Sequence, residues 1–384
     1  MDRRSFLLGT SALAVSQLVI GCGGKNPTEF KVQLLKGSIP VQTVNQFRKS
    51  LKSEVKLKFT PINQIQELFE QLKRWKEPKV KNNLEKWTGY IPFVGDNKVT
   101  KADLVTLGDY WLKSAIEQKL IEPIEIEKIK QWSVLDEKWQ QLVKRDQKGN
   151  LSPQGKVWGV PYRWGNTVIV YNREKFQELG WQPKDWDDLW RNELRSRISL
   201  LNQPREVIGL VLKKLGKSYN TENIDQIPDL EQELQVLNQQ VKFYDSTNYL
   251  EPLITGDTWL AVGWSSDVVS VLGRYPQLSA IVPQSGTAIW ADLWVQPTGI
   301  NKSALSSDWI NFCWESNIAK QIAIFSKSNS PINPNIVLSD IQKPLQSLLL
   351  TNREVFDKSE FLLPLSLKTT NQYESLFTKI KMAG

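Results

Sequence analysis

The 384-residue sequence has no histidine and contains only two cysteines and two methionines. Without histidine, the chain cannot form a Ser-His-Asp triad, a Cys-His pair or a histidine-ligated zinc site. It also has no close cysteine pair and no acidic loop of the calcium-binding type, so we expect no metal and no cofactor. Cys22 belongs to an N-terminal leader, which leaves Cys313 without a disulfide partner.

Long hydrophobic runs are absent apart from one in the first 24 residues, which we predict to be an export signal. The pair Arg3–Arg4 precedes an apolar run at Phe6–Ile20, as in twin-arginine signals. This run of about 15 residues is shorter than the roughly 20 that span a bilayer. The sequence VIGC at Val19–Cys22 resembles a bacterial lipobox, and the alternative is an ordinary cleaved signal with an incidental cysteine. We predict export to the bacterial periplasm and a lipid anchor at Cys22.

Charge of one sign is in excess but is not clustered. Lysine and arginine outnumber the acidic residues, and the formal net charge is +8. In a cytosolic protein this excess would favour nucleic-acid binding. Because the chain is predicted to be exported and its basic residues are scattered, we expect a solvated surface near anionic lipid and no nucleic-acid partner.

Short apolar segments alternate with segments of helical periodicity, which predicts mainly parallel sheets with helices on both faces. The chain is too long for one core and predicts two domains, with a ligand between them. The predicted strands are 30–37, 55–61, 102–108, 166–172, 197–202, 259–264, 278–283 and 287–297. The predicted helices are 41–51, 62–75, 109–120, 204–216, 229–240, 307–325 and 366–382.

Tryptophan is abundant, and aromatic residues stand at the ends of several predicted strands. The chain has 16 tryptophans, of which Trp164, Trp264 and Trp290 hold such positions, as does Tyr110. An indole ring attracts a cation by about 0.5–2 kcal/mol. These residues are therefore candidates for binding a cationic ligand, and ordinary core packing is the alternative for each of them.

An aspartate lies between two tryptophans in the stretch AIWADLWVQP. Alternation along a strand places Trp290, Asp292 and Trp294 on one face, where the carboxylate would pair with an ammonium group. Capping of a nearby backbone turn is the other interpretation of Asp292. Arg163 would repel such a ligand, and alternation predicts that it points away, on the face opposite Trp164.

Glu206 has two possible roles. Pro204 marks the first position of a predicted helix, so Glu206 stands in its first turn, where it favours the helix N-terminus and can reach back to the cap. The same position lies at a strand-to-helix junction, where a residue that binds a ligand would also be found. The sequence leaves both roles open.

Six stretches in this order resemble the periplasmic spermidine/putrescine-binding proteins of bacterial ABC importers. The resemblance implies two lobes of the type II periplasmic-binding-protein fold, crossed by two hinge strands and closing on a polyamine. It predicts lobe 1 at 25–163 and 291–335, and lobe 2 at 164–290 and 336–384. The stretches are GVPYRWGNTVIVYN, DWDDLW, REVIGLVLKKLG, GDTWLAVGWSSD, IWADLWVQPTGINK and WINFCWESNIAKQIA.

The resemblance also implies roles for single residues. Asp292 and Glu206 correspond to carboxylates that hold amines, and Trp264, Trp290 and Tyr110 correspond to aromatic walls. The chain departs from the family at Leu34–Pro40, which has no aromatic residue, and at Gln203, which replaces an acid; residues 76–101 resemble an insertion. The predicted ligand-binding residues are Asp292, Trp290, Trp264, Glu206, Tyr110, Trp164, Gln203, Gly37 and Ser38.

We therefore predict a monomeric substrate-binding protein, not an enzyme, that delivers a small cationic amine such as putrescine or spermidine to an ABC permease. Another amine or an amino acid in the same fold is an alternative, since Lys36 and Gln203 make the cleft less negative. An exported carbohydrate hydrolase with two carboxylates is the alternative from another class. A membrane-anchored interaction protein without a ligand is a third possibility.

Overall fold

The computed structural model describes residues 28–76, 101–300, 303–332, 336–349 and 352–383. The predicted leader with Cys22 and nearly all of the predicted insertion lie outside these residues. Within the described part of the chain, no helix is both long and apolar enough to cross a membrane.

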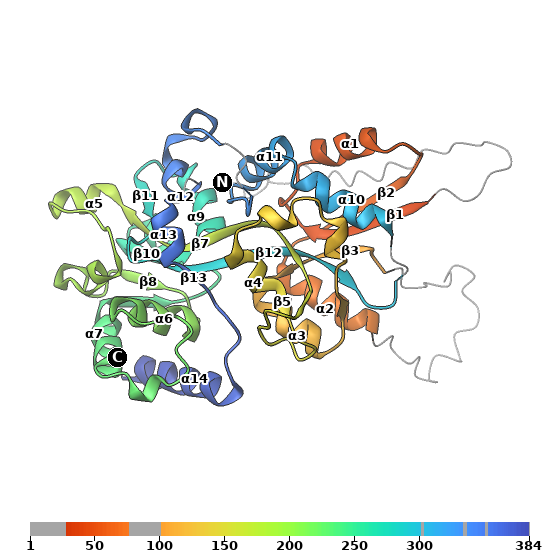
Figure 1. The fold of residues 1–384 in the computed structure, drawn as a ribbon. Helices are drawn as coiled ribbons and strands as arrows, with labels where there is room; N and C mark the ends of the chain where they lie inside the picture. The colour runs from red at the N-terminus through yellow and green to blue at the C-terminus, as the bar shows by residue number, and fades with distance from the viewer. Residues whose placement is uncertain (1–27, 77–100, 301–302, 333–335, 350–351, 384) are drawn as a thin grey trace, which may run out of the picture.

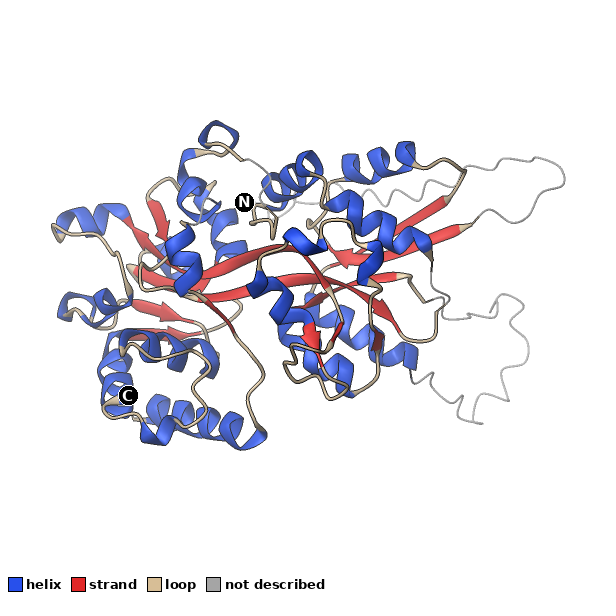
Figure 2. Ribbon diagram, in the orientation of Figure 1, coloured by secondary structure: helices blue, strands red, loops and turns tan. Residues whose placement is uncertain are grey.

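Two lobes share one continuous sheet (Figure 1; Figure 2), whose strand order is β2-β1-β3-β12-β7-β10-β8-β9. The three strands at each end run parallel, and the long strands β7 and β12 pair antiparallel in the middle and cross between the lobes. The predicted two-lobed α/β class is thus confirmed. The main strands are β1 (Glu29–Leu35), β2 (Lys56–Ile62), β3 (Leu104–Gly108), β7 (Val160–Asn172), β8 (Ile198–Leu200), β9 (Val241–Tyr244), β10 (Leu260–Trp264) and β12 (Ala288–Pro297). The short strands are β4 (Ile121–Glu122), β5 (Lys144–Arg145), β6 (Lys156–Val157), β11 (Leu278–Ile281) and β13 (Glu360–Phe361).

Helices cover both faces of each half of the sheet. We call the half with β1–β3 lobe 1 and the half with β8–β10 lobe 2. Lobe 1 carries α1 (Val41–Ser50), α2 (Ile65–Lys76), α3 (Leu112–Glu117), α4 (Glu137–Val143), α10 (Ala304–Cys313) and α11 (Ser316–Ser326). Lobe 2 carries α5 (Arg173–Glu178), α6 (Pro204–Lys214), α7 (Leu230–Gln240), α8 (Glu251–Thr255), α9 (Ser265–Leu272), α12 (Gln346–Leu349) and α14 (Leu367–Met382).

Strand alternation sorts the core of lobe 2 into two clusters. Ile169 and Tyr171 of β7 pack with α6, α7 and α14, whereas Val168 and Val170 pack with α9 and α12 on the other face. Both faces of this half are therefore buried, as expected for a sheet covered by helices. Lobe 1 has one large core, rich in aromatic residues. The lobe boundaries given above remain a prediction.

Two of the differences from the sequence prediction affect the arrangement of the lobes. The helix predicted at 307–325 is two helices, because Glu315 takes an extended conformation and the Trp314 indole donates to the Pro161 carbonyl oxygen at 2.8 Å. Strand β10, predicted to be of the buried parallel kind, pairs parallel with β8 but antiparallel with β7. Strand β7, which crosses between the lobes, therefore runs opposite to the parallel strands β8, β9 and β10 of lobe 2.

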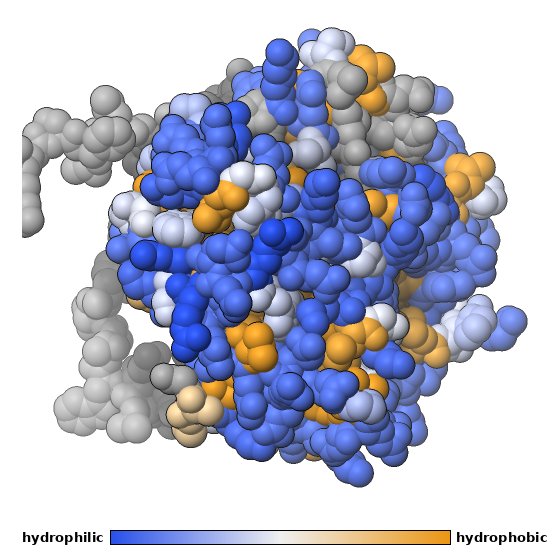
Figure 3. Space-filling view, turned by 90° about the vertical axis from the view of Figure 1, so that its left-hand side faces the viewer, coloured by the Kyte–Doolittle hydropathy of each residue, from blue (hydrophilic) through white to orange (hydrophobic). Residues whose placement is uncertain are grey.

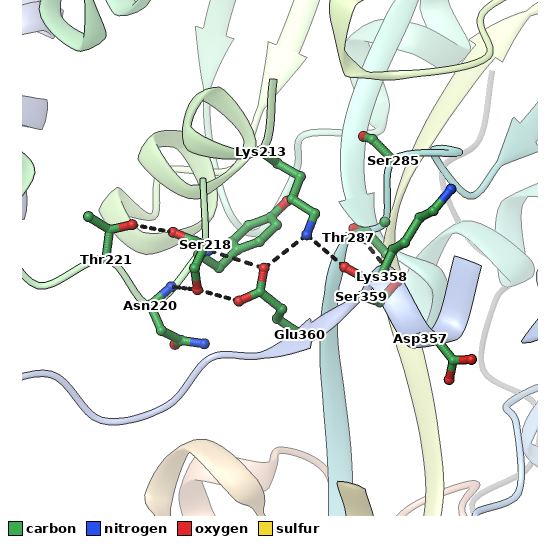
Figure 4. A network of polar contacts seen from close by, with 12 residues as sticks. Lys213, Ser218, Asn220, Thr221, Ser285, Thr287, Asp357, Lys358, Ser359 and Glu360 are labelled. Atoms are coloured by element: carbon green, nitrogen blue, oxygen red, sulfur yellow. Dashed lines mark hydrogen bonds and ion pairs between the residues drawn. The ribbon is translucent and has the colours of Figure 1, made fainter. Parts of the chain in front are cut away.

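A C-terminal strap lies where the two lobes meet; it consists of α13 (Arg353–Lys358) and β13, which pairs with β12. On the lobe 1 side, the Lys138 ammonium donates to the Phe356 carbonyl oxygen at 2.8 Å. On the lobe 2 side, the Glu360 carboxylate accepts from Lys213 at 2.9 Å and from the Ser218 hydroxyl (Figure 4). The strap therefore holds both lobes by polar contacts.

The surface of lobe 2 seen in Figure 3 is largely hydrophilic, and apolar residues form small separate groups on it. This agrees with the scattered charges of the sequence. The hydrophobic residues of the described chain are mainly interior, with exceptions such as Tyr110 and Val134.

Candidate ligand-binding site

The candidate site lies on one face of the crossing strands. Arg163, Gly165 and Thr167 are two residues apart on β7, so their side-chain positions share a face. In the antiparallel register, Asp292 of β12 stands opposite Arg163, and Trp290 stands opposite Gly165. Cross-strand neighbours of this kind lie on the same face. The two strands thus place the predicted Trp290 and Asp292 beside Arg163.

Arg163 and Asp292 form a buried ion pair. Nε and Nη2 of Arg163 both lie 2.6 Å from Oδ2 of Asp292, and the two residues are 6% and 5% exposed. The guanidinium carbon lies 5.6 Å from the centre of the Trp290 ring. Burial raises the pKa of the Asp292 carboxyl, and the charge and hydrogen bonds of Arg163 oppose that rise. The cation next to Asp292 and Trp290 is therefore one of the protein's own side chains.

The prediction that Arg163 points away from the site is wrong. Alternation does put Arg163 and Trp164 on opposite faces, but the face of Asp292 is that of Arg163. The register shifts between Asp292 and Leu293, and this irregularity brings Tyr162 onto Trp294 with ring centres 4.2 Å apart. Trp294 is completely buried there.

Asp109 is a second buried carboxylate beside Asp292, and it is not among the residues predicted from the sequence. It follows β3 directly, and its Oδ1 accepts a hydrogen bond from the Ala291 amide at 2.9 Å. Burial raises its pKa to about 7; the Ala291 hydrogen bond lowers the value and the Asp292 charge raises it. Its position at a strand end, next to the predicted Tyr110, was the available signal.

Glu206 and Trp264, both predicted, come together in lobe 2. The Trp264 indole donates to Oε1 of Glu206 and the Thr167 hydroxyl donates to Oε2, each at 2.9 Å. Glu206 is 6% exposed, and burial raises its pKa while these two hydrogen bonds lower it. The carboxylate is therefore turned toward β7 and β10, and it forms no hydrogen bond that caps its own helix.

Gly165 joins the two halves of the site. A Cβ atom on Gly165 would approach both the Trp290 ring and the Ser265 hydroxyl to less than 3 Å. Ser265 directly follows Trp264 and accepts a hydrogen bond from the Asn166 amide at 3.1 Å. Only glycine leaves room for this close approach, so Trp290 of the Asp292 cluster lies next to the segment that carries Trp264.

The other predicted residues have less direct positions. Trp164 packs on Trp139 and Phe356 in the lobe 1 core, and its indole donates to the Ser330 carbonyl oxygen. Tyr110 is 60% exposed beside Asp109. The remaining three residues lie at turns or helix ends: Gly37 with a positive φ of 78°, Ser38 buried after it, and Gln203 exposed at the N-terminus of α6.

The arrangement is suited to binding a cation. Glu206 is a buried carboxylate beside the Trp264 indole, whereas Asp292, beside Trp290, is already paired with Arg163, and Asp109 is buried next to Asp292. Removing a carboxylate from water is costly unless a cation or hydrogen-bond donors compensate it. Among the described residues, no group of three or more potential metal ligands lies together.

Comparison with known proteins identifies the class. The model of the family described as "Bacterial extracellular solute-binding protein" matches residues 100–351, well over half of the sequence. The chain therefore belongs to this family, which consists of substrate-binding transport proteins.

Relatives within the family carry more specific names. The spermidine/putrescine-binding periplasmic protein of Escherichia coli (strain K12) is 26% identical over 224 residues, which cover 58% of this chain and 61% of that protein. The putrescine/cadaverine-binding protein of Pseudomonas aeruginosa is 27% identical over 183 residues, covering 44% of this chain and 51% of that protein. The chain thus spans less than two thirds of these relatives.

Solved structures of other proteins share the fold. A spermidine/putrescine ABC transporter substrate-binding protein from Streptococcus pneumoniae is 20% identical, with a TM-score of 0.75 over 92% of this chain and 99% of that one. A Listeria monocytogenes ABC substrate-binding protein in complex with cycloalternan is 16% identical, with a TM-score of 0.64 over 93% and 96%. The names of these two proteins refer to very different ligands, so the fold alone does not define one.

Proposed function

We propose that this chain is the extracytoplasmic substrate-binding protein of an ABC importer and that it binds a small cationic amine between its lobes. The observation that carries the proposal is Glu206, a buried carboxylate that accepts hydrogen bonds only from neutral donors. No lysine or arginine of the described chain forms an ion pair with it. An ammonium group from a ligand would supply the missing positive charge.

The two-lobed arrangement supports a mechanism in which the protein binds its ligand by closing and catalyses no reaction. Open lobes would expose the site, and an amine held by Glu206 and Trp264 in lobe 2 and covered by Trp290 and Tyr110 on the other side would favour the closed state. Such a ligand shifts the population because it binds the closed form more tightly. The amine would be released unchanged, which distinguishes a binding protein from a hydrolase.

The proposals on export and anchoring follow from the sequence. The leader would export the chain through the twin-arginine route, and lipidation of Cys22 would hold a monomer at the membrane near its permease. The names of the relatives make putrescine, cadaverine and spermidine the first compounds to test.

Glu206→Gln tests the proposal. The substitution preserves shape but removes the charge, and we expect amine affinity to fall about 10- to 100-fold. Tryptophan fluorescence of the mature protein, titrated with putrescine, spermidine and a neutral amino acid, measures this change. Glu354→Gln, on the exposed side of α13, is the matched control and should bind like the wild type. Equal affinity in both variants, or tighter binding of the neutral amino acid, would contradict amine binding at Glu206.

A second measurement addresses turnover. Putrescine incubated with the protein should be recovered quantitatively by mass spectrometry, because the proposed mechanism breaks no bond. A sugar oligomer incubated in parallel should also be recovered intact. Consumption of the sugar oligomer would favour the hydrolase alternative, and consumption of putrescine would contradict a mechanism that breaks no bond.

A further inference from the structure

One cation position of the site is already filled by the protein. Against Asp292 and Trp290, the Arg163 guanidinium makes both kinds of contact that a ligand ammonium would make: a charged hydrogen bond to the carboxylate and an approach to the indole ring. Two of its nitrogens bind the same carboxylate oxygen. A ligand ammonium could take this position only by displacing a buried arginine.

The lobe 1 half of the site has no negative charge left over. Asp292 is paired with Arg163 at contact distance. Asp109 forms no ion pair in the described chain, but burial raises its pKa to about 7, so it is partly protonated near neutral pH, and the charge of a second buried arginine, Arg145, acts on it. Arg145 itself donates to the Leu142 carbonyl oxygen at 2.7 Å. If Asp109 is ionised the four groups sum to zero, and if it is protonated they sum to +1. This half therefore does not attract a second ammonium group.

The lobe 2 half differs because its carboxylate lacks a cation at contact distance. The charge of Arg205 lowers the pKa of Glu206, but its guanidinium donates to the carbonyl oxygens of Leu363 and Tyr219 and to Asn220, and it forms no ion pair with Glu206. Glu206 is thus the carboxylate at which one positive charge of a ligand is still needed.

We propose that Arg163 makes this site selective for amines that carry a single positive charge, because its guanidinium occupies the position that a second ammonium group would need. The inference rests on the proposed function and narrows its substrate class from small amines in general to monocations. Arg163 is then the residue that sets specificity, and Glu206 binds the one ammonium group.

Butylamine and putrescine form a matched pair of probes, since both have a four-carbon chain and they differ by one ammonium group. We expect the wild-type protein to bind putrescine no more than threefold tighter than butylamine. In Arg163→Gln, Asp292 is left without its cation, and the preference for putrescine should rise at least tenfold. Arg163→Lys keeps the charge and should keep the wild-type ratio, whatever its absolute affinities. Calorimetric titration of the mature protein measures all six dissociation constants.

Melting temperatures provide a second test of the inference in case Arg163→Gln folds poorly. Putrescine should raise the melting temperature of Arg163→Gln by more than it raises that of the wild type, because a ligand ammonium replaces the lost guanidinium. The double variant Arg163→Gln/Asp292→Asn has no unpaired carboxylate and should lose this extra shift. An equal shift in the double variant would overturn the assignment to Asp292.

The outcomes separate the two proposals. A wild-type protein that prefers putrescine over butylamine by tenfold or more overturns selectivity by Arg163 and leaves amine binding intact. Absence of binding of either amine to the wild type and to Arg163→Gln rejects amine binding itself, and the inference with it. An unchanged ratio in Arg163→Gln shows that the guanidinium does not set the selectivity.

Discussion

Asp292 in lobe 1 and Glu206 in lobe 2 are alike in burial but not in partners. Both are about 95% buried, and burial raises the pKa of both carboxyls. Asp292 binds a guanidinium through one short hydrogen bond and a second ion-pair contact, whereas Glu206 binds a hydroxyl and an indole. A buried carboxylate therefore does not by itself indicate a place for a cationic ligand. The decisive feature is whether the protein already provides the cation.

Removal of one member of the Arg163–Asp292 pair should have the largest effect on stability. Asp292→Leu leaves the Arg163 guanidinium buried without a counter-ion. Arg163→Met leaves the Asp292 carboxylate buried without a counter-ion. Each should lower the free energy of unfolding by about 3–5 kcal/mol. The double variant removes both charges and should recover most of the loss. Urea unfolding curves measure all four proteins. If the double variant lost as much free energy of unfolding as the two single variants together, the two groups would not depend on each other.

The next largest effect is expected at Gly165, because its lack of a side chain allows Trp290 and Ser265 to approach the same point of β7. Gly165→Ala would force Trp290 or Ser265 to move, at a cost of about 1–3 kcal/mol, and should also weaken amine binding. Gly273→Ala is the matched control, since a Cβ there meets no atom within 4 Å. Differential scanning calorimetry should place only the Gly165 variant below the wild type. A normal melting temperature for Gly165→Ala would show that the crossing strands adapt freely.

Much of the fold follows from local patterns in the sequence. Pro204 marks the first residue of α6, and alternation correctly places Trp290 and Asp292 on one face. The sequence also indicated Glu206 and Trp264, which lie 58 residues apart in the chain and meet in the structure. It left open whether Glu206 caps its own helix, because that depends on which strands lie beside α6. Local periodicity carries no information on such pairings.

The direction of Arg163 could not be predicted for a related reason. Alternation relates residues within one strand, but the partner of Arg163 is set by the register of β7 on β12. That register includes an irregularity after Asp292, which moves Tyr162 onto Trp294. A one-residue shift would exchange the faces of the strand, so the ion pair depends on long-range pairing.

Asp109 is a third buried carboxylate beside Asp292 and Glu206, and its pKa makes its effect on stability depend on pH. Its folded-state pKa of about 7 lies above the unfolded value near 3.9, so the native protein binds more protons between these pH values. Stability should consequently rise as the pH falls from 7 to 5, by about 2 kcal/mol from this group. Asp109→Asn should remove that part of the slope. Urea midpoints at pH 5, 6, 7 and 8 measure the difference, and parallel profiles for the two proteins would exclude this role of Asp109.

The smallest effect is expected at the strap, where an ion pair similar to that of Asp292 is only partly buried. The Glu360 and Lys213 side chains are 24% and 14% exposed, so water screens their attraction. Glu360→Gln should lower the free energy of unfolding by less than about 1 kcal/mol, far less than the loss at Asp292. Glu354→Gln, on the outer side of α13, should leave stability unchanged. If Glu360→Gln proved as destabilising as Asp292→Leu, the degree of burial would not determine how much each ion pair stabilises the protein.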